Sequence, residues 1–218
     1  MAIKGQVRAD GVRPRGAAGP AVKRSLATRI LRKVRRDLRY YGLRAHTVWF
    51  AATRGVKVGK GTLIFPGARM SKIGGGTIRI GSYCVFHHGS LLATYGGDIH
   101  ISDRVSLNDY SILYGHGGLE VGEGARIAAH TVVIPSNHGI DADEPIWMQP
   151  MALRGIVIGK DVWMGTGVRV LDGSVIADGC VIAAGAVVLP TLQTEPMGIY
   201  GGVPARKISS RIRSQDPS

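Results

Sequence analysis

One aliphatic position recurs every six residues along much of the chain, and this period limits the possible folds more than any other feature. The clearest run has an aliphatic residue or Met at Ile158, Met164, Val170, Ile176, Ile182 and Val188. Side chains repeat their direction about every 2 residues in a β-strand and about every 3.6 in an α-helix, so neither a simple meander nor a helix explains the pattern. The period indicates a unit made of one short strand and one corner.

The same register continues upstream in four further sets of three hexapeptides. Their marked residues are Val58, Ile64 and Met70; Ile80, Phe86 and Leu92; Ile101, Leu107 and Leu113; and Val121, Ile127 and Val133. Three hexapeptides can close a triangular coil with the marked residues inside, and stacked coils can pair their backbones in parallel. We therefore predict an all-β fold, a parallel β-helix of about six coils over residues 55–192, with residues 193–218 as a C-terminal tail.

Glycines and cysteines occupy fixed slots in this register. Glycines follow marked residues, as at Gly81 and Gly159, where a corner leaves little room for a Cβ. Cys84 and Cys180 each stand four residues after a marked residue, a slot otherwise filled by small side chains. We expect both to be small inward-facing residues of their coils, because two cysteines are too few for a disulfide framework.

The largest interruption of the repeat covers residues 135–155 and is the candidate functional loop. It opens with PSNHGIDADE, which contains His138. A neutral imidazole can take a proton from a hydroxyl near pH 7. Asp141, Glu144 or a backbone carbonyl could orient the ring, and the sequence leaves this choice open. The alternative interpretation is a solvent-facing loop histidine.

Residues 100–208 resemble the maltose, galactoside and nodulation-factor O-acetyltransferase branch of the hexapeptide-repeat acyltransferases. The matching features are the Asn-His pair at the start of the loop, IGKDVWMGTGVRV from residue 158, IADGCVIAAGAVV from residue 176 and GGVPARKI from residue 201. The resemblance implies a left-handed β-helix, a homotrimer, acetyl-CoA as co-substrate without a required metal, and a sugar or glycan acceptor.

The resemblance also implies roles for individual residues. His138 matches the base that deprotonates the acceptor for direct attack on the thioester, and Asn108 matches an acceptor-binding asparagine, with a corner residue as the alternative interpretation. In place of the Thr-Lys pair that relatives often carry for a phosphate contact, this chain has Leu189 and Pro190. The remaining matches are Trp163 beside the acceptor, the backbone of Thr166 for the oxyanion and the cofactor, Ala184 and Gly185 along the pantetheine arm, and Arg206 and Lys207 near the nucleotide phosphates.

Positive charge is concentrated in the N-terminal part of the chain. Residues 1–57 hold 15 basic and 2 acidic residues, whereas residues 58–218 hold 13 of each. A neutral body argues against nucleic acid as a partner. Residues 1–21 are rich in Gly, Pro and Arg and predict a disordered basic tail, while residues 22–54 predict an amphipathic basic helix with Gly42 as a candidate break.

Three interpretations of this helix remain open. It could cap the first coil with Leu26, Ile30, Val34 and Leu38, pack on a neighbouring subunit, or hold residues 23–39 against an anionic membrane. Apolar runs stay below the roughly 18 residues that span a bilayer, and the first residues lack a signal-peptide core. We therefore expect a cytoplasmic protein, peripheral at the inner face of the membrane if the third interpretation holds.

The favoured function is acetyl-CoA-dependent O-acetylation of a sugar hydroxyl in bacterial surface-polysaccharide or glycan biosynthesis. The alternatives are N-acetylation of an amino sugar or antibiotic on the same fold, and a non-catalytic β-helix scaffold. A zinc site like that of the γ-class carbonic anhydrases would draw on His87, His88, His116 and His130. The spacing of His116, His130 and His138 does not fit the close pair that such sites use, so we expect no metal site.

Overall fold

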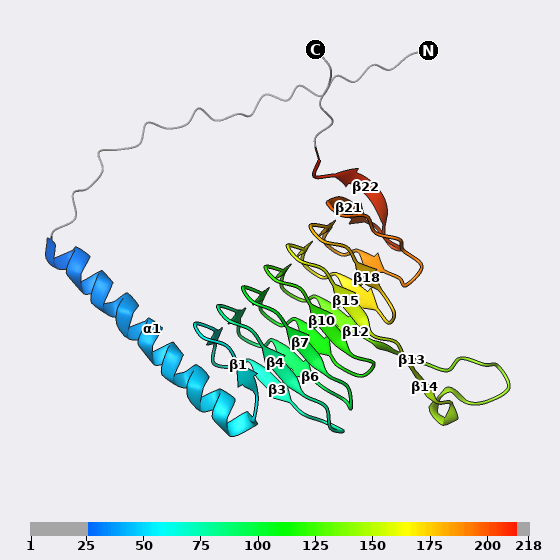
Figure 1. Ribbon diagram of the computed structural model, residues 1–218, viewed down its shortest axis with the longest axis horizontal. Helices are drawn as coiled ribbons and strands as arrows, with labels where there is room; N and C mark the ends of the chain where they lie inside the picture. The colour runs from blue at the N-terminus through cyan, green and yellow to red at the C-terminus, as the bar shows by residue number, and fades with distance from the viewer. Residues whose placement is uncertain (1–25, 213–218) are drawn as a thin grey trace, which may run out of the picture. The chain divides into compact units, whose positions relative to one another are not determined.

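The computed structural model describes residues 26–212, and most of its β-strands form three sheets of mainly parallel strands wound into a solenoid (Figure 1). Sheet A contains β1 (Lys57–Val58), β4 (Ile78–Ile80), β7 (Ile99–Ile101), β10 (Leu119–Val121), β15 (Ile156–Ile158) and β18 (Val175–Ile176). Sheet B contains β2 (Leu63–Ile64), β5 (Val85–Phe86), β8 (Ser106–Leu107), β11 (Arg126–Ile127), β16 (Trp163–Met164), β19 (Val181–Ile182), β21 (Gly198–Gly201) and β22 (Arg206–Ser210). Sheet C contains β3 (Arg69–Ser71), β6 (Leu91–Ala93), β9 (Ile112–Tyr114), β12 (Val132–Ile134), β17 (Arg169–Leu171) and β20 (Val187–Val188).

Each coil contributes one strand to each sheet in the order A, B, C, which confirms the predicted parallel β-helix. Six coils are complete in the described part of the chain, and β21 extends sheet B as part of a seventh. The segment predicted as a tail is therefore structured to Ile212, because β22 turns back and pairs antiparallel with β21.

The residues that recur with the six-residue period form the core. Every marked residue is buried except Val58 of the first coil, which is partly buried against the same core. On sheet B the ladder Ile64, Phe86, Leu107, Ile127, Met164 and Ile182 is completely buried. Cys84 and Cys180 are also buried, as predicted, and burial raises the pKa of both thiols.

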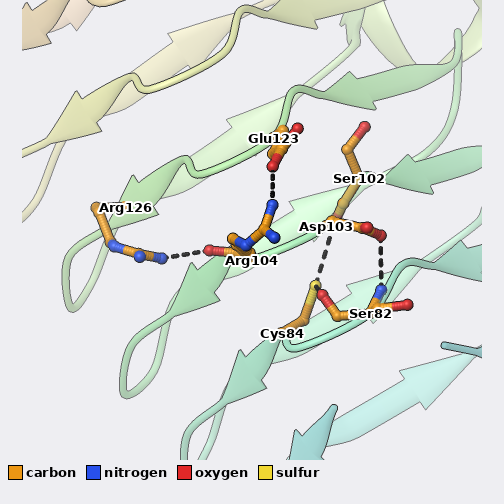
Figure 2. Close-up of polar contacts among 7 residues, drawn as sticks. All are labelled: Ser82, Cys84, Ser102, Asp103, Arg104, Glu123 and Arg126. Atoms are coloured by element: carbon orange, nitrogen blue, oxygen red, sulfur yellow. Dashed lines mark hydrogen bonds and ion pairs between the residues drawn. The ribbon is translucent and has the colours of Figure 1, made fainter. Parts of the chain in front are cut away.

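Side chains tie successive coils together at the corner between sheets A and B (Figure 2). The Asp103 carboxylate accepts a hydrogen bond of 2.7 Å from the backbone N–H of Ser82, and the Cys84 thiol donates one of 3.1 Å to the carbonyl of Ser102. Arg104 forms an ion pair with Glu123. A Cβ on Gly81 would lie 2.4 Å from the Asp103 carboxylate, which explains why this corner position is glycine.

Helix α1 (Leu26–Arg54) continues through Gly42 without the break that the sequence suggested. Its residues 39–54 belong to the same compact unit as the β-helix, whereas residues 26–38 form a separate unit. Within the larger unit, Thr47 accepts a hydrogen bond of 2.9 Å from the N–H of Ile64, and His46 lies 2.9 Å from the carbonyl of Ile64. Phe50 is buried in the core. These residues cover the free edge of β2.

The residues seen to pack on the first coil lie later in the helix than those that the sequence analysis considered for the cap. Ile30, Val34 and Leu38 are each about half exposed or more in the described structure, and the side chain of Leu26 lies outside the described residues. The helix is amphipathic as predicted, but the face that packs on the first coil comes from a later segment. None of the described helices is long and apolar enough to cross a membrane.

The buried ladder gives a stability prediction. Leu107→Ala removes a completely buried side chain from the middle of the stack and leaves a cavity, so we expect a loss of about 2–5 kcal/mol in the free energy of unfolding. Val175→Ala changes a side chain that is 58% exposed and should cost about 0.5 kcal/mol. Urea unfolding followed by circular dichroism measures both, and equal losses would contradict the assigned core.

Candidate active site

The insertion at residues 135–155 forms a hairpin that projects from the stack between β12 and β15 (Figure 1). Its strands β13 (Ser136–His138) and β14 (Met151–Leu153) pair antiparallel, with His138 opposite Met151. A 3₁₀ helix, η1 (Ile146–Met148), lies between them. The repeat is thus interrupted by a short hairpin whose loop, residues 139–150, contains one turn of 3₁₀ helix.

His138 is the last residue of β13 and is exposed. Its backbone N–H bonds to the side chain of Asn137 at 2.9 Å, while its imidazole has no hydrogen-bond partner among the described residues. Neither Asp141 nor Glu144 pairs with the ring, although the sequence offered both as candidates. The ring is therefore accessible to a substrate, and no group of the described chain fixes its orientation.

Gln149, which the sequence analysis did not identify, holds the hairpin loop in shape. Its side chain is only 7% exposed. The amide oxygen accepts a hydrogen bond of 2.8 Å from the N–H of Asp141, and the amide nitrogen donates to the carbonyls of Asp141 and Glu144. A Cβ on Gly139 would lie 2.6 Å from the Gln149 amide oxygen. The residue directly after His138 must therefore be small. The available sequence signal was a single polar residue within the apolar stretch IWMQPMAL.

A second group of predicted residues lies where each coil passes from sheet B to sheet C, here called the B–C corner. Asn108 lies there in the third coil and donates through its side chain to the carbonyl of Ile127 at 3.0 Å. Two coils further on, the carbonyl of Thr166 accepts a hydrogen bond of 2.9 Å from the N–H of Gly185. The structure thus stacks Thr166 and Gly185 directly and places Asn108 on the same corner.

The B–C corner offers free donors and an open surface. The backbone N–H of Thr166 has no acceptor among the described residues, and the corresponding N–H groups of Asp109 and Ala129 share this property. Gly185 adopts a φ of 71°, and no atom lies within 4 Å of the place where its Cβ would be. A Cβ on Gly165 would lie 2.6 Å from the backbone N of Ala184. Small side chains therefore leave a narrow exposed strip along this corner.

The remaining predicted residues are exposed on sheet B. Trp163 is 53% exposed and pairs with Arg126 of the coil before it. Arg206 and Lys207 lie on β22, next to the open end of the solenoid. Lys207 donates to the carboxylate of Glu195 at 2.6 Å, and this hydrogen bond raises the pKa of its ammonium group. Arg206 forms no ion pair within the described residues, so its charge is free to meet a ligand.

The structure does not bring His138 to the other predicted residues within one chain. The strand β12 runs from the B–C corner to Pro135, where the hairpin leaves the stack. Asn108 and Thr166 lie at the B–C corner, so the width of sheet C separates them from the root of the hairpin. No hydrogen bond within the described residues joins His138 to either one. The predicted site is thus divided into two halves in a single chain.

Three of the four histidines considered as zinc ligands stack on aromatic rings. His87 stacks on Phe65, His116 on Tyr95 and His130 on Tyr110, with ring centroids 4.7–5.6 Å apart. Burial lowers the pKa of His116, which favours its neutral form. Within residues 26–212, no three His, Cys, Asp or Glu side chains converge as metal ligands would.

Comparison with known proteins gives three findings. Residues 155–190 match the family model described as bacterial transferase hexapeptide (six repeats). The chain is 30% identical over 142 residues to the "Putative lipopolysaccharide biosynthesis O-acetyl transferase WbbJ" of Escherichia coli K12, which covers 61% of this chain and 71% of that protein. The fold is similar to that of AntD, an N-acyltransferase from Bacillus cereus. A mutant of AntD in complex with dTDP-4-amino-4,6-dideoxyglucose and Coenzyme A has 24% sequence identity and a TM-score of 0.59, over 72% of this chain and 84% of that chain.

The contacts of Gln149 predict a local effect on the hairpin. Gln149→Ala removes three hydrogen bonds that hold residues 141–149, while the solenoid core stays intact. We expect faster hydrogen exchange and faster proteolytic cleavage within residues 139–150, with an unchanged midpoint of thermal unfolding. An Asp143→Asn variant changes an exposed side chain of the same loop and should keep the exchange rates of the wild type. Equal exchange in the wild type and Gln149→Ala would refute this role of Gln149.

Proposed function

This chain belongs to the hexapeptide-repeat acyltransferase family, and from that premise we propose that it is an acetyl-CoA-dependent O-acetyltransferase. The proposed acceptor is a sugar hydroxyl in bacterial surface-polysaccharide or glycan biosynthesis. The observation that carries the proposal is the exposed, unpaired imidazole of His138 on a hairpin that interrupts the repeat. The similarity to WbbJ, whose name refers to lipopolysaccharide biosynthesis, supports the choice of a glycan acceptor.

In the proposed reaction His138 acts as general base. A nitrogen of its neutral ring takes the proton of the acceptor hydroxyl while the oxygen attacks the thioester carbonyl of acetyl-CoA. The carbonyl oxygen gains negative charge, for which the free N–H of Thr166 is the proposed donor. The C–S bond then breaks, and the imidazolium returns the proton to the CoA thiolate. No covalent enzyme intermediate forms, and Asn108 and Trp163 contact the acceptor.

The binding of acetyl-CoA uses the strip at the B–C corner. The pantetheine arm lies along Ala184 and Gly185, where open space adjoins the small side chains. Arg206 pairs with a phosphate group of the nucleotide, because its guanidinium is not engaged in an ion pair within the described chain. Lys207 contributes less than the sequence suggested, since Glu195 already neutralises it.

The proposed active enzyme is a homotrimer in which the two halves of the site come from different subunits. The hairpin of one subunit would bring His138 to the B–C corner of its neighbour, joining residues that a single chain keeps apart. The exposed apolar tip of the hairpin supports this arrangement, since Ile140 is 78% and Trp147 82% exposed in the single chain.

The proposed location is the cytoplasm, with the enzyme peripheral at the inner face of the membrane. Residues 23–39 carry many basic side chains on an amphipathic segment, of which residues 26–39 lie within the described helix. Ile30 and Leu38 are exposed there. Such a segment is suited to an anionic bilayer surface, where lipid-linked glycan precursors would be substrates.

The N-acetyltransferase and scaffold alternatives are distinguished by two assays. Release of CoA from acetyl-CoA is compared for methyl glucoside and methyl glucosaminide, which differ by one hydroxyl replaced by an amine. Preferential turnover of the amine would support N-acetylation over the proposed reaction. An unchanged unfolding temperature in the presence of acetyl-CoA would favour a non-catalytic scaffold.

The general-base role predicts the effect of His138→Ala. Loss of proton transfer should lower kcat for acetyl transfer by roughly 10²–10⁴-fold, while the exposed position should leave folding unchanged. The measurement is CoA release under saturating acetyl-CoA, with circular dichroism to check the fold. Asp141→Asn and Glu144→Gln are matched controls on the same loop and should keep most of the activity. If His138→Ala keeps most of the activity as well, the mechanism is wrong.

A site divided between subunits predicts complementation between inactive variants. His138→Ala and Asn108→Ala chains, co-expressed in equal amounts, form mixed trimers in which some interfaces combine an intact His138 with an intact Asn108. Random assembly should restore about a quarter of the wild-type CoA release per chain, because one site in four receives both intact residues. Co-expression without recovery would place the whole site in one chain.

A further inference from the structure

We propose that the capping segment of helix α1 and the groove beside it form a docking surface for an anionic lipid bilayer. This surface consists of Tyr41, Ala45, Val48, Trp49 and Ala52 on the helix, with Arg44, Lys57 and Lys60 at the groove. It is separate from residues 23–39. The inference rests on the proposed function, because acetylation of a membrane-linked glycan gives the enzyme a reason to lie on the bilayer.

The way in which the helix packs on the first coil determines which of its faces is exposed. Leu43, His46, Thr47 and Phe50 recur at three- and four-residue spacing, and this face covers β2. Residues 41, 45, 48, 49 and 52 follow the same spacing on another side of the helix. Tyr41 is 69%, Val48 65% and Trp49 63% exposed. An apolar stripe with Tyr and Trp therefore points away from the core.

A basic groove adjoins this stripe. It has a volume of about 720 Å³, and Val48 and Ala52 of the stripe form part of its wall. Arg44, Lys57 and Lys60 also line it, and no Asp or Glu does. Within the described residues none of these three cations forms an ion pair. A Cβ on Gly55, another lining residue, would lie 3.2 Å from the Lys72 ammonium, so a fourth cation is close.

Charge decides which partner fits this surface. A second copy of the chain that docked through the same surface in a two-fold contact would bring like charges together, because residues 39–60 contain Arg39, Arg44, Arg54, Lys57 and Lys60 and no acidic residue. An anionic bilayer complements these charges, and each Lys or Arg near such a surface contributes about 1 kcal/mol to binding. Tyr and Trp are the aromatic residues enriched at the membrane–water interface. The apolar stripe and the groove thus point to the same partner.

The test measures binding of the full-length protein to vesicles by co-sedimentation. We expect binding to mixed phosphatidylcholine–phosphatidylglycerol vesicles and much weaker binding to phosphatidylcholine alone. The double variant Lys57→Gln/Lys60→Gln should reduce partitioning onto the mixed vesicles by about thirtyfold. Equal binding of this variant and the wild type would overturn the proposal.

A matched control removes the same charge elsewhere on the solenoid. Arg126 and Lys160 are exposed cations of the fourth and fifth coils, and neither lines the groove. Arg126→Gln/Lys160→Gln therefore removes the same charge outside the groove, and should keep partitioning within about twofold of the wild type. An equal loss in both double variants would show attraction to net charge only and would overturn the docking surface.

Insertion of the apolar stripe is tested with Trp49. Brominated lipids should quench part of the tryptophan emission of the bound wild type. Trp49→Phe keeps an apolar ring and should bind equally well but lose that quenching. If the quenching persists in Trp49→Phe, the stripe does not enter the bilayer and the proposal fails. It also fails if Val48→Ser/Trp49→Ser lowers the oligomer mass in sedimentation without weakening vesicle binding, because the stripe then contacts a second copy.

The same variants separate this inference from the proposed function. CoA release with a soluble sugar acceptor should be unchanged in Lys57→Gln/Lys60→Gln, because the groove contains none of the proposed site residues. Normal CoA release without vesicle binding in the wild type would reject the docking surface alone. Vesicle binding without CoA release for any acceptor would reject the proposed function and leave the docking surface standing.

Discussion

The hydrogen bonds between successive coils are the interaction on which the rest of the structure depends. Each strand finds its backbone partners in the coils before and after it, so the first and last coils are left with one open edge each. At the first coil, His46 and Thr47 of helix α1 contact the free backbone groups of Ile64. At the other end, β21 extends sheet B and β22 turns back on it. The N-terminal helix and the C-terminal segment therefore both serve to end the stack.

The regular coils carry one half of the proposed site at the B–C corner. The hairpin that projects from the solenoid carries the other half. Small residues make the B–C corner an exposed strip, while β13 of the projecting hairpin ends at His138. The hairpin lies outside the stack of coils, and three hydrogen bonds of the Gln149 side chain hold its loop. A rigid solenoid with one internally braced arm gives a geometry in which a neighbouring copy can complete the proposed site.

The fold could be predicted well from the sequence, because the inward-facing residues of each coil follow from the spacing within that coil. A six-residue period requires an inward residue at each turn, and Leu107 or Met164 can be assigned from spacing alone. Gln149 and Thr47 could not be assigned in this way, because their partners are set by a loop path and by the position of a helix. The separation of His138 from Asn108 could not be predicted from the sequence. The repeat register assigns a residue to a corner of its coil, but it does not give the direction in which an insertion projects.

The described basic residues lie at separate parts of the fold. Residues 58–218 are neutral as a whole, so a CoA phosphate would be met by a placed cation such as Arg206, while Lys207 is already paired with Glu195. The excess of positive charge lies in residues 1–57. Of its described residues, Arg44 on helix α1 and Lys57 on β1 line the groove at the first coil. The basic groove and the strip at the B–C corner have no residue in common. A substitution that removes a charge at the first coil should therefore weaken binding of the protein to a bilayer and leave its acetyl-transfer activity unchanged.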